Sequence, residues 1–391
     1  MKDVMKKRID EMIMRDLRRG AFVGANAAVF RDGECLYGGS FGMADREVGI
    51  PMRPISIFRI YSMTKPVTAA AVMQLVERGF FDTQTPVSAF IPEFAGTKVY
   101  EADGTTRPSA REITIQDLLT MRSGLTYPNH GTFTQKDTAS LFGEMAIRRD
   151  GDTPMDTMEF CRRIAKIPLS FDPGKDWDYG VSADVLGGVV QAATGMNYRD
   201  YLKKYIFEPL DMKNTDFYVP EEHLDHFTAS YTLDSNGKLQ RDDACYLGLN
   251  DYRTVPAFVS GGAGLCSTIP DYARFAEALV NGGETKDGVR ILSRKSVDYI
   301  RTPQVSREVL APKNWDSLKG YAYGSLVRVL EERSEFGTIA TPGEFGWDGW
   351  TGTYFCVDPA EKLSIFFWIQ LANAGTCDTA KRMRNIVYGC I

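Results

Sequence analysis

The sequence has no apolar segment that approaches the roughly 18 residues needed for a membrane-spanning helix. Its first segment, MKDVMKKRIDEMIMRDLRRG, carries charges throughout and lacks the apolar centre of a signal peptide. We expect it to form an amphipathic helix with one apolar stripe of Val4, Ile9, Met12, Ile13 and Leu17 packed on the protein. The sequence thus predicts no membrane span and a cytoplasmic location.

A surplus of basic residues is also missing. The 391 residues include 46 Lys and Arg against 51 Asp and Glu, which gives a net charge of −5 at pH 7. A nucleic-acid partner is not expected, because binding would need cations to replace the counterions of the phosphates. Hydrophobic residues at 43% and charged residues at 25% are typical of a folded globular protein, and the length allows a large core.

Cysteine and histidine are sparse, and neither forms a recognisable metal or disulfide motif. The seven cysteines are scattered and include no CxxC, which favours reduced thiols and a cytoplasmic setting. Among three histidines, His223 and His226 lie beside Glu222 and Asp225 and could suggest a metal site. The segment PEEHLDH is more typical of a solvated polar turn or short helix, so we predict no metal and no organic cofactor.

Strand-like segments occur near both ends of the chain, and helical patterns fill the middle. Two apolar runs flank Arg31-Asp32-Gly33 and predict a hairpin; YAYGSLVRVL, TYFCVDP and KLSIFFWIQL predict later strands, and a helix is expected at residues 379–388. We therefore expect an α+β fold with one antiparallel sheet built from both termini and flanked by helices. The predicted domains are a discontinuous α/β domain, 1–81 with 251–391, and a mainly helical inserted domain, 82–250.

The segment SMTKPVTAAAVMQLVERGF predicts a helix that begins with a reactive pair. Residues three apart share one helix face, so Lys65 can place its amine beside the hydroxyl of Ser62. Pro66 is tolerated only in the first turn, which puts Ser62 at the helix N-terminus, where developing negative charge is favoured. A serine needs a base to become nucleophilic, and a buried lysine with a lowered pKa can be that base. Alone, S-x-x-K also fits a helix cap followed by a surface lysine.

Five segments, in order along the chain, resemble motifs of the serine β-lactamase and penicillin-binding-protein group, specifically its class C-like branch with the family VIII carboxylesterases. They are FRIYSMTKPVTAAAVMQLVERG, LLTMRSGL (118–125), DPGKDWDYG (172–180), PLDMKNTDF (209–217) and GGAGLCSTIPDYARF (261–275). The resemblance covers most of the chain and implies a β-lactamase/transpeptidase-like fold. It also implies a serine hydrolase that forms an acyl-enzyme.

The resemblance assigns roles to particular residues. Ser62 takes the nucleophile position and Lys65 the base position, and Tyr179 matches the tyrosine of the Y-x-N motif, which shuttles the proton. A tyrosine beside a lysine ammonium would have a lowered pKa, which would make the phenolate a plausible base. Without the resemblance, Tyr179 is more simply a core aromatic after a turn.

A second set of roles falls on the segment that occupies the place of the family's K/H-T-G strand, Trp347-Asp348-Gly349. Gly349 allows the backbone to approach the substrate, and the backbone N–H of Trp350 would pair with that of Ser62 as an oxyanion hole. A strand and turn packed on a helix is the structural alternative.

Two departures from the family pattern bear on the substrate. Val181 replaces the asparagine of Y-x-N, and Trp347-Asp348 replaces the cation and hydroxyl that bind a substrate carboxylate. The carboxylate of a β-lactam or peptide then lacks its usual binding partners, so an esterase acting on small acyl esters is expected first. A β-lactamase, a D-amino-acid amidase or peptidase, and an acyltransferase are the alternatives, all with small-molecule esters, amides or β-lactams as substrates. An Asp348 that faces the pocket could instead attract an ammonium group. Oligomeric state is not readable from these patterns.

Two rival interpretations remain open at this point. Gly38-Gly39-Ser40-Phe41-Gly42 fits the G-x-S-x-G motif of α/β-hydrolases, which needs a strand, a sharp turn and a helix. No apolar helix face follows Ser40, and no histidine follows His226 to complete a triad. The other rival is a non-catalytic penicillin-binding-like scaffold, which would not react with a fluorophosphonate probe.

Overall fold

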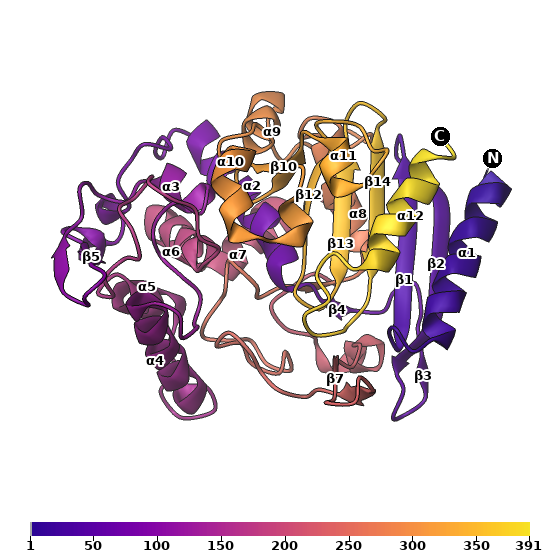
Figure 1. The fold of residues 1–391 in the computed structure, drawn as a ribbon, viewed down its shortest axis with the longest axis horizontal. Coiled ribbons are helices and arrows are strands. Elements are labelled where there is room, and N and C mark those ends of the chain that lie inside the picture. The colour runs from indigo at the N-terminus through magenta and orange to yellow at the C-terminus, as the bar shows by residue number, and fades with distance from the viewer. Residues whose placement is uncertain (1) are drawn as a thin grey trace.

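The computed structural model describes residues 2–391, and its central feature is an eight-stranded antiparallel sheet with the order β10-β11-β12-β13-β14-β1-β2-β3 (Figure 1). The last long strand lies beside the first, with a register from Asn26 opposite Trp368 to Arg31 opposite Leu363. Both ends of the chain therefore build the sheet, as predicted. The strands are β1 (Gly24–Arg31), β2 (Glu34–Asp45), β3 (Ile50–Pro51), β10 (Tyr321–Tyr323), β11 (Arg328–Leu330), β12 (Phe345–Asp348), β13 (Thr353–Asp358) and β14 (Leu363–Trp368).

Local turn chemistry explains the hairpins. Asp32 and Gly33 both have positive φ, 50° and 75°, which suits the tight turn that joins β1 to β2. The segment YAYGSLVRVL, expected to be strand-like, forms the hairpin β10–β11. Its chain reverses at Gly324–Leu326, where Leu326 has a φ of 59°. Gly324 and Ser325 interrupt the apolar pattern there, so the segment forms two short strands joined by a turn.

Helices cover both faces of the sheet. On one face lie α1 (Lys2–Arg18) and α12 (Asp378–Tyr388), side by side with the two termini together (Figure 1). Helix α1 buries Met5, Ile9, Met12 and Ile13, whereas Val4, which was expected in the stripe, is 49% exposed. Helix α8 (Ile269–Val280) contacts β1, β13 and β14 from the other face.

The helix that follows Ser62, α2 (Thr64–Glu77), runs through the centre of the molecule. Its residues from Thr64 to Leu75 are all buried, because it contacts α6 (Ser182–Thr194) and α9 (Arg294–Ile300). This near-complete burial fits a helix that is surrounded by other elements and is apolar on most of its circumference.

Besides short 3₁₀ and π-helical turns, residues 82–250 hold five α-helices and two small hairpins. These are α3 (Ile115–Leu119), α4 (Phe133–Arg148), α5 (Thr157–Ile164), α6, α7 (Tyr198–Leu202), β5 (Lys98–Tyr100) with β6 (Thr106–Pro108), and β7 (Tyr231–Leu233) with β8 (Leu239–Arg241). The remaining elements are β4 (Phe58–Arg59), paired with β9 (Cys266–Ser267), and the short helices α10 (Arg307–Leu310) and α11 (Arg333–Phe336). The division into two domains stays a prediction.

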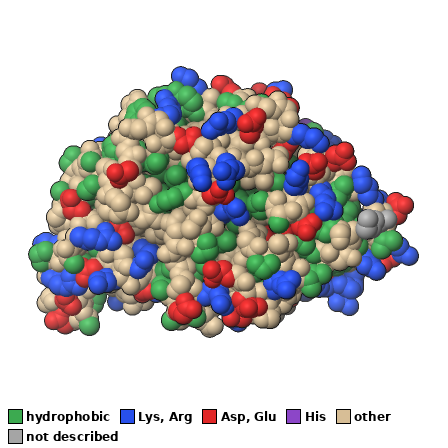
Figure 2. All heavy atoms as spheres, turned by 90° about the horizontal axis from the view of Figure 1, so that it is seen from above, with side chains coloured by type: hydrophobic (Ala, Val, Ile, Leu, Met, Phe, Trp, Pro, Cys, Tyr) green, Lys and Arg blue, Asp and Glu red, His purple; other side chains and the backbone are tan. Residues whose placement is uncertain are grey.

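Acidic and basic side chains are interspersed over the face seen in Figure 2, as the small net charge suggests. Among the helices of residues 2–391, none combines the length and the hydrophobicity that crossing a bilayer requires.

Candidate active site

The predicted nucleophile lies in a tight turn before α2. Tyr61–Met63 form a 3₁₀ turn that continues into the helix at Thr64, with Pro66 in its first turn as expected. Tyr61 has a φ of 41°, a conformation unfavourable for a bulky L-residue. Its ring packs edge-to-face against Trp350, 5.3 Å between centroids, and this contact helps hold the turn. The turn places Ser62, 9% exposed, at a helix N-terminus.

The amine of Lys65 is completely buried beside the Ser62 hydroxyl. Its Nζ lies 3.1 Å from Ser62 Oγ, 3.0 Å from the Tyr127 hydroxyl and 2.8 Å from the Gly262 carbonyl oxygen. All three partners are uncharged. Burial therefore dominates and lowers the pKa of Lys65 to about 7, against the opposing effects of the more distant Asp184 and Asp348. Near neutral pH a large share of Lys65 is uncharged and able to accept a proton.

A buried carboxylate in the first turn of α6 supports the loop that holds Lys65. Asp184 accepts hydrogen bonds from the Gly262 amide, at 3.0 Å, and from the Ser260 hydroxyl. Burial raises the pKa of Asp184, while these bonds and Lys65 oppose the rise. The sequence interpretation missed Asp184. The available signal was an acidic residue within the apolar helix pattern SADVLGGVV.

Tyr179 lies against Lys65 but with its pKa shifted opposite to the prediction. Lys65 Nζ is 4.5 Å from the centre of its ring, and Trp347 Nε1 donates a 2.9 Å hydrogen bond to its hydroxyl oxygen. Burial raises the pKa of Tyr179, although hydrogen bonding with Ser62 and Trp347 opposes this. The expectation of a lowered pKa is wrong because desolvation outweighs the hydrogen bonds that would lower it. At neutral pH Tyr179 therefore keeps its phenol proton.

A second tyrosine, absent from the sequence prediction, also contacts the amine. Tyr127 follows LLTMRSGL by two positions, and its ring lies 5.6 Å from that of Tyr179. Burial raises the pKa of Tyr127 well above its usual value. Two neutral phenols and one carbonyl thus surround Lys65, which keeps the amine desolvated without supplying a counter-ion.

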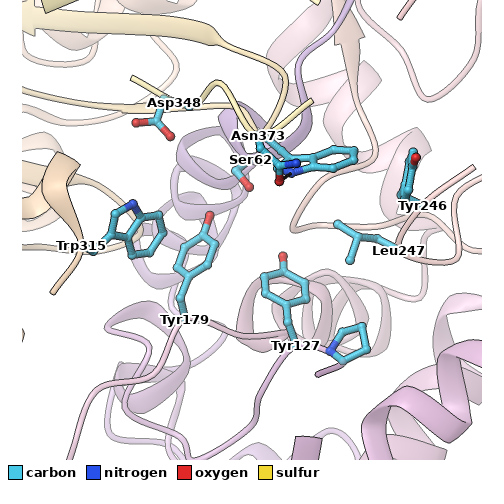
Figure 3. Close-up of a pocket in the computed structure, with 11 residues that line it drawn as sticks. Ser62, Tyr127, Tyr179, Tyr246, Leu247, Trp315, Asp348 and Asn373 are labelled. Carbon is cyan, nitrogen blue, oxygen red and sulfur yellow. Dashed lines mark hydrogen bonds between the residues drawn. The ribbon is translucent and has the colours of Figure 1, made fainter. Parts of the chain in front are cut away.

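Ser62 opens into a cavity of about 530 Å³ whose walls include five aromatic side chains (Figure 3). The lining residues are Ser62, Tyr127, Pro128, Tyr179, Tyr246, Leu247, Trp315, Asp348, Trp350, Asn373 and Gly375. Within the described chain, no lysine or arginine lines this cavity. Three residues predicted to bind substrate, Val181, Trp347 and Gly349, are not at its wall; Val181 and Trp347 are buried behind it.

The end of β12 approaches the Ser62 turn closely at Gly349. A Cβ atom at that position would lie 2.4 Å from the carbonyl oxygen of Ile60, so only glycine fits. Just beyond it, Trp350 Nε1 donates a 2.7 Å hydrogen bond to Asn373 Oδ1. The backbone N–H groups of Ser62 and Trp350 donate to no backbone group in the described chain, so both remain available to another acceptor.

Asp348 lines the cavity, but its charge is already balanced. Its Oδ2 accepts a 2.8 Å hydrogen bond from Arg328 Nη1 and another from the Thr376 hydroxyl. Arg328 is 1% exposed and Asp348 5% exposed. Attraction of an ammonium group by a free carboxylate, one of the sequence-based alternatives, is therefore weakened by this ion pair.

The structure does not support the two alternative sites, Ser40 as a nucleophile and the segment of His223 and His226 as a metal site. Ser40 lies within β2, opposite Asn26, and the strand continues past it to Asp45, so it does not occupy a strand–turn–helix. Residues Glu221–His226 form a 3₁₀ turn in which the rings of His223 and His226 are 6.4 Å apart. Among residues 2–391 there is no group of three or more His, Cys, Asp or Glu side chains able to hold a metal ion.

Comparison with known proteins identifies the family of the chain. Residues 9–387 match the Beta-lactamase family. The chain belongs to that family. It is 33% identical to Esterase EstB of Burkholderia gladioli over 384 residues, which covers 94% of this chain and 91% of the relative.

Solved structures show the same fold. EstCE1, described as a hydrolase with promiscuous acyltransferase activity, has a TM-score of 0.83 with 23% identity over 99% of both chains. Simvastatin synthase (LovD) from Aspergillus terreus has a TM-score of 0.80 with 22% identity, covering 98% of this chain and 97% of that one. The chain is a serine hydrolase with the β-lactamase fold.

Proposed function

We propose that this hydrolase is an esterase that works through an acyl-enzyme on Ser62. The observation that carries the proposal is the buried Lys65, which contacts Ser62 and no counter-ion, below a cavity that no cation of residues 2–391 lines. The first feature supplies a base for the nucleophile. The second favours uncharged esters over β-lactams and peptides, whose carboxylate would need a cation.

In the proposed mechanism, the proton of Ser62 moves to uncharged Lys65 as Oγ attacks the ester carbonyl. The resulting oxyanion accepts hydrogen bonds from the Ser62 and Trp350 amides. When the bond to the alcohol breaks, Tyr179 gives its proton to the leaving oxygen and regains one from Lys65. Trp347 orients this step, because its N–H occupies a lone pair of the phenol oxygen and leaves the O–H free to donate. Water then attacks the acyl-enzyme by the reverse proton route.

Hydrolysis of p-nitrophenyl acetate, p-nitrophenyl butyrate and nitrocefin by wild type and Ser62→Ala tests the proposal. We expect ester hydrolysis that disappears in the variant, with little turnover of nitrocefin. Efficient turnover of nitrocefin would make the protein a β-lactamase, and ester hydrolysis that survives in Ser62→Ala would contradict the nucleophile. Labelling of Ser62 by a fluorophosphonate distinguishes either enzyme from a scaffold.

Acyl transfer to an alcohol is a second candidate. The apolar walls Leu247, Trp315 and Trp350 could hold an alcohol acceptor in place of water, and two structural neighbours carry acyltransferase or synthase names. Adding an alcohol to the ester assay and measuring the ratio of new ester to free acid tests it. The predicted cytoplasmic location, with which seven free cysteines are compatible, remains a proposal.

A further inference from the structure

Asp348 presents two different oxygens. Oδ2 is fixed by Arg328 and Thr376, whereas Oδ1 accepts no hydrogen bond from any residue in the described range 2–391. The residue is 95% buried, yet it lines the cavity, and Gly375 lies beside Oδ1, where an added Cβ would come within 3.8 Å of it. The carboxylate is thus held in place by one oxygen and offers the other to the cavity as a hydrogen-bond acceptor.

The two ends of the cavity differ in chemistry. In Figure 3, Asp348 and Trp315 lie on one side of Ser62, and Tyr246 and Leu247 lie on the other. An ester bound at Ser62 therefore has one part directed toward an apolar wall and one part directed toward Asp348. A wholly apolar group at the second position would leave a desolvated carboxylate oxygen without a partner, which is costly.

The charge of the matching group follows from the ion pair. Asp348 is the only charged residue of the described cavity wall, and Arg328 already balances it at 2.8 Å. An anion would find no cation at the wall. An ammonium group would lose its hydration and find only a carboxylate that is already paired. An uncharged O–H or N–H group gives Oδ1 its missing hydrogen bond without adding charge.

We propose that the Asp348 end of the cavity is a specificity site for an uncharged hydrogen-bond donor, a hydroxyl or amide N–H, carried by the substrate. The site deepens the proposed esterase function and rests on it, since Ser62 defines where the two parts of the substrate diverge. The substrate class is then an ester with one apolar part and one hydroxylated or amide-bearing part.

Substituted phenylboronic acids test the site without requiring turnover. Boron forms a reversible bond to Ser62 Oγ and becomes tetrahedral, while the serine proton passes to Lys65. The series carries hydroxymethyl, ethyl, aminomethyl or acetyl at the meta or para position, and inhibition constants are measured against p-nitrophenyl butyrate or by calorimetry. Hydroxymethyl and ethyl differ by one O–H in place of a methyl. Aminomethyl carries a cation and acetyl carries an acceptor only.

We expect hydroxymethyl to bind roughly tenfold or more tightly than ethyl at one ring position, because the acceptor is a carboxylate. It should also bind more tightly than aminomethyl. In Asp348→Asn, Arg328 retains the amide oxygen and the NH₂ group turns to the cavity, so acetyl should gain on hydroxymethyl. Ratios are compared between proteins, so the electronic effect of each substituent cancels. Leu247→Ala, on the opposite wall, should weaken all members alike.

Equal binding of hydroxymethyl and ethyl at both ring positions in the wild type would overturn the site, whatever the folding of the variant. Tightest binding by aminomethyl would replace it with a cation site, and ratios unchanged in Asp348→Asn would remove Asp348 from it. Absence of ester turnover with the boronate selectivity intact would reject the esterase proposal and keep the donor site. Ester turnover without boronate selectivity would keep the esterase proposal and reject the donor site.

Discussion

Two buried basic side chains, Lys65 and Arg328, lie at the candidate active site, and their pKa values shift in opposite directions. Lys65 is fully buried among a hydroxyl, two phenol rings and a carbonyl, and its pKa falls to about 7. Arg328 is equally buried but contacts the carboxylate of Asp348, and its pKa rises. The difference lies in direct contact with an anion. Burial without a counter-ion yields a base that works near neutral pH, whereas burial with one yields a permanent structural charge.

The largest expected effect comes from making Lys65 resemble Arg328. In Lys65→Arg the buried group keeps its charge and cannot accept the serine proton, because guanidinium does not deprotonate in proteins. We expect kcat/KM for p-nitrophenyl butyrate to fall by about a thousandfold, within the range for loss of a general base. Circular dichroism should show that the fold persists. Activity within tenfold of wild type would contradict the assignment of Lys65 as the base.

Removing the ion pair of Arg328 and Asp348 should lower the stability of the fold more than it lowers the catalytic rate. Arg328→Met leaves Asp348 buried and charged, so urea unfolding should show a loss of about 3–5 kcal/mol. The double variant Arg328→Met/Asp348→Asn removes the stranded charge and should recover much of this. The exposed pair of Arg294 and Asp298 is the control: Arg294→Met should cost less than about 1 kcal/mol. A double variant no more stable than Arg328→Met would show that the arginine acts through packing alone.

Sequence reasoning reached one of these two cations and missed the other. Ser62 and Lys65 are neighbours on one helix turn, and the hairpin at Asp32-Gly33 depends on its own residues, so local spacing predicts both. Arg328 lies in an apolar strand pattern, and its partner is 20 residues away on another strand. Only the register of β11 and β12 brings the two together.

The same limit explains the other misses. Tyr127 and Asp184 reach Lys65 from segments 62 and more than 100 positions away. The direction of the pKa shift of Tyr179 depends on burial by Trp315, Trp177 and Trp347, which no single segment reveals. Motif matching predicted the reacting groups, whereas the direction of each pKa shift depends on tertiary packing.

A smaller effect is expected when the hydrogen bond of Trp347 is removed but its aromatic bulk is kept. Trp347→Phe keeps an aromatic ring behind Tyr179 and removes the N–H that holds the phenol oxygen. We expect kcat to fall by about three- to tenfold, as for one neutral hydrogen bond, with KM nearly unchanged because the residue does not line the cavity. Single-turnover acylation measures it. A change confined to KM would place Trp347 in substrate binding, as the sequence first suggested.

The smallest expected effect concerns Asp184, which raises the pKa of Lys65 without contacting it. In the proposed mechanism uncharged Lys65 is the active form, so kcat/KM should fall about tenfold per pH unit below its pKa of about 7 and level off above it. Asp184 raises that pKa, so Asp184→Asn should move the acidic limb to lower pH, by on the order of one unit or less, with the plateau retained. The amide oxygen can still accept from Gly262 and Ser260, so the loop that holds Lys65 should keep its place. A limb that moves to higher pH would mean that the substitution displaces the loop, and a limb that stays fixed would mean that Asp184 carries no charge in the free enzyme. A shift to lower pH would show that Asp184 raises the pKa of Lys65 through space. Asp348 raises the pKa of Arg328 in the same way but more strongly, because the two are in direct contact.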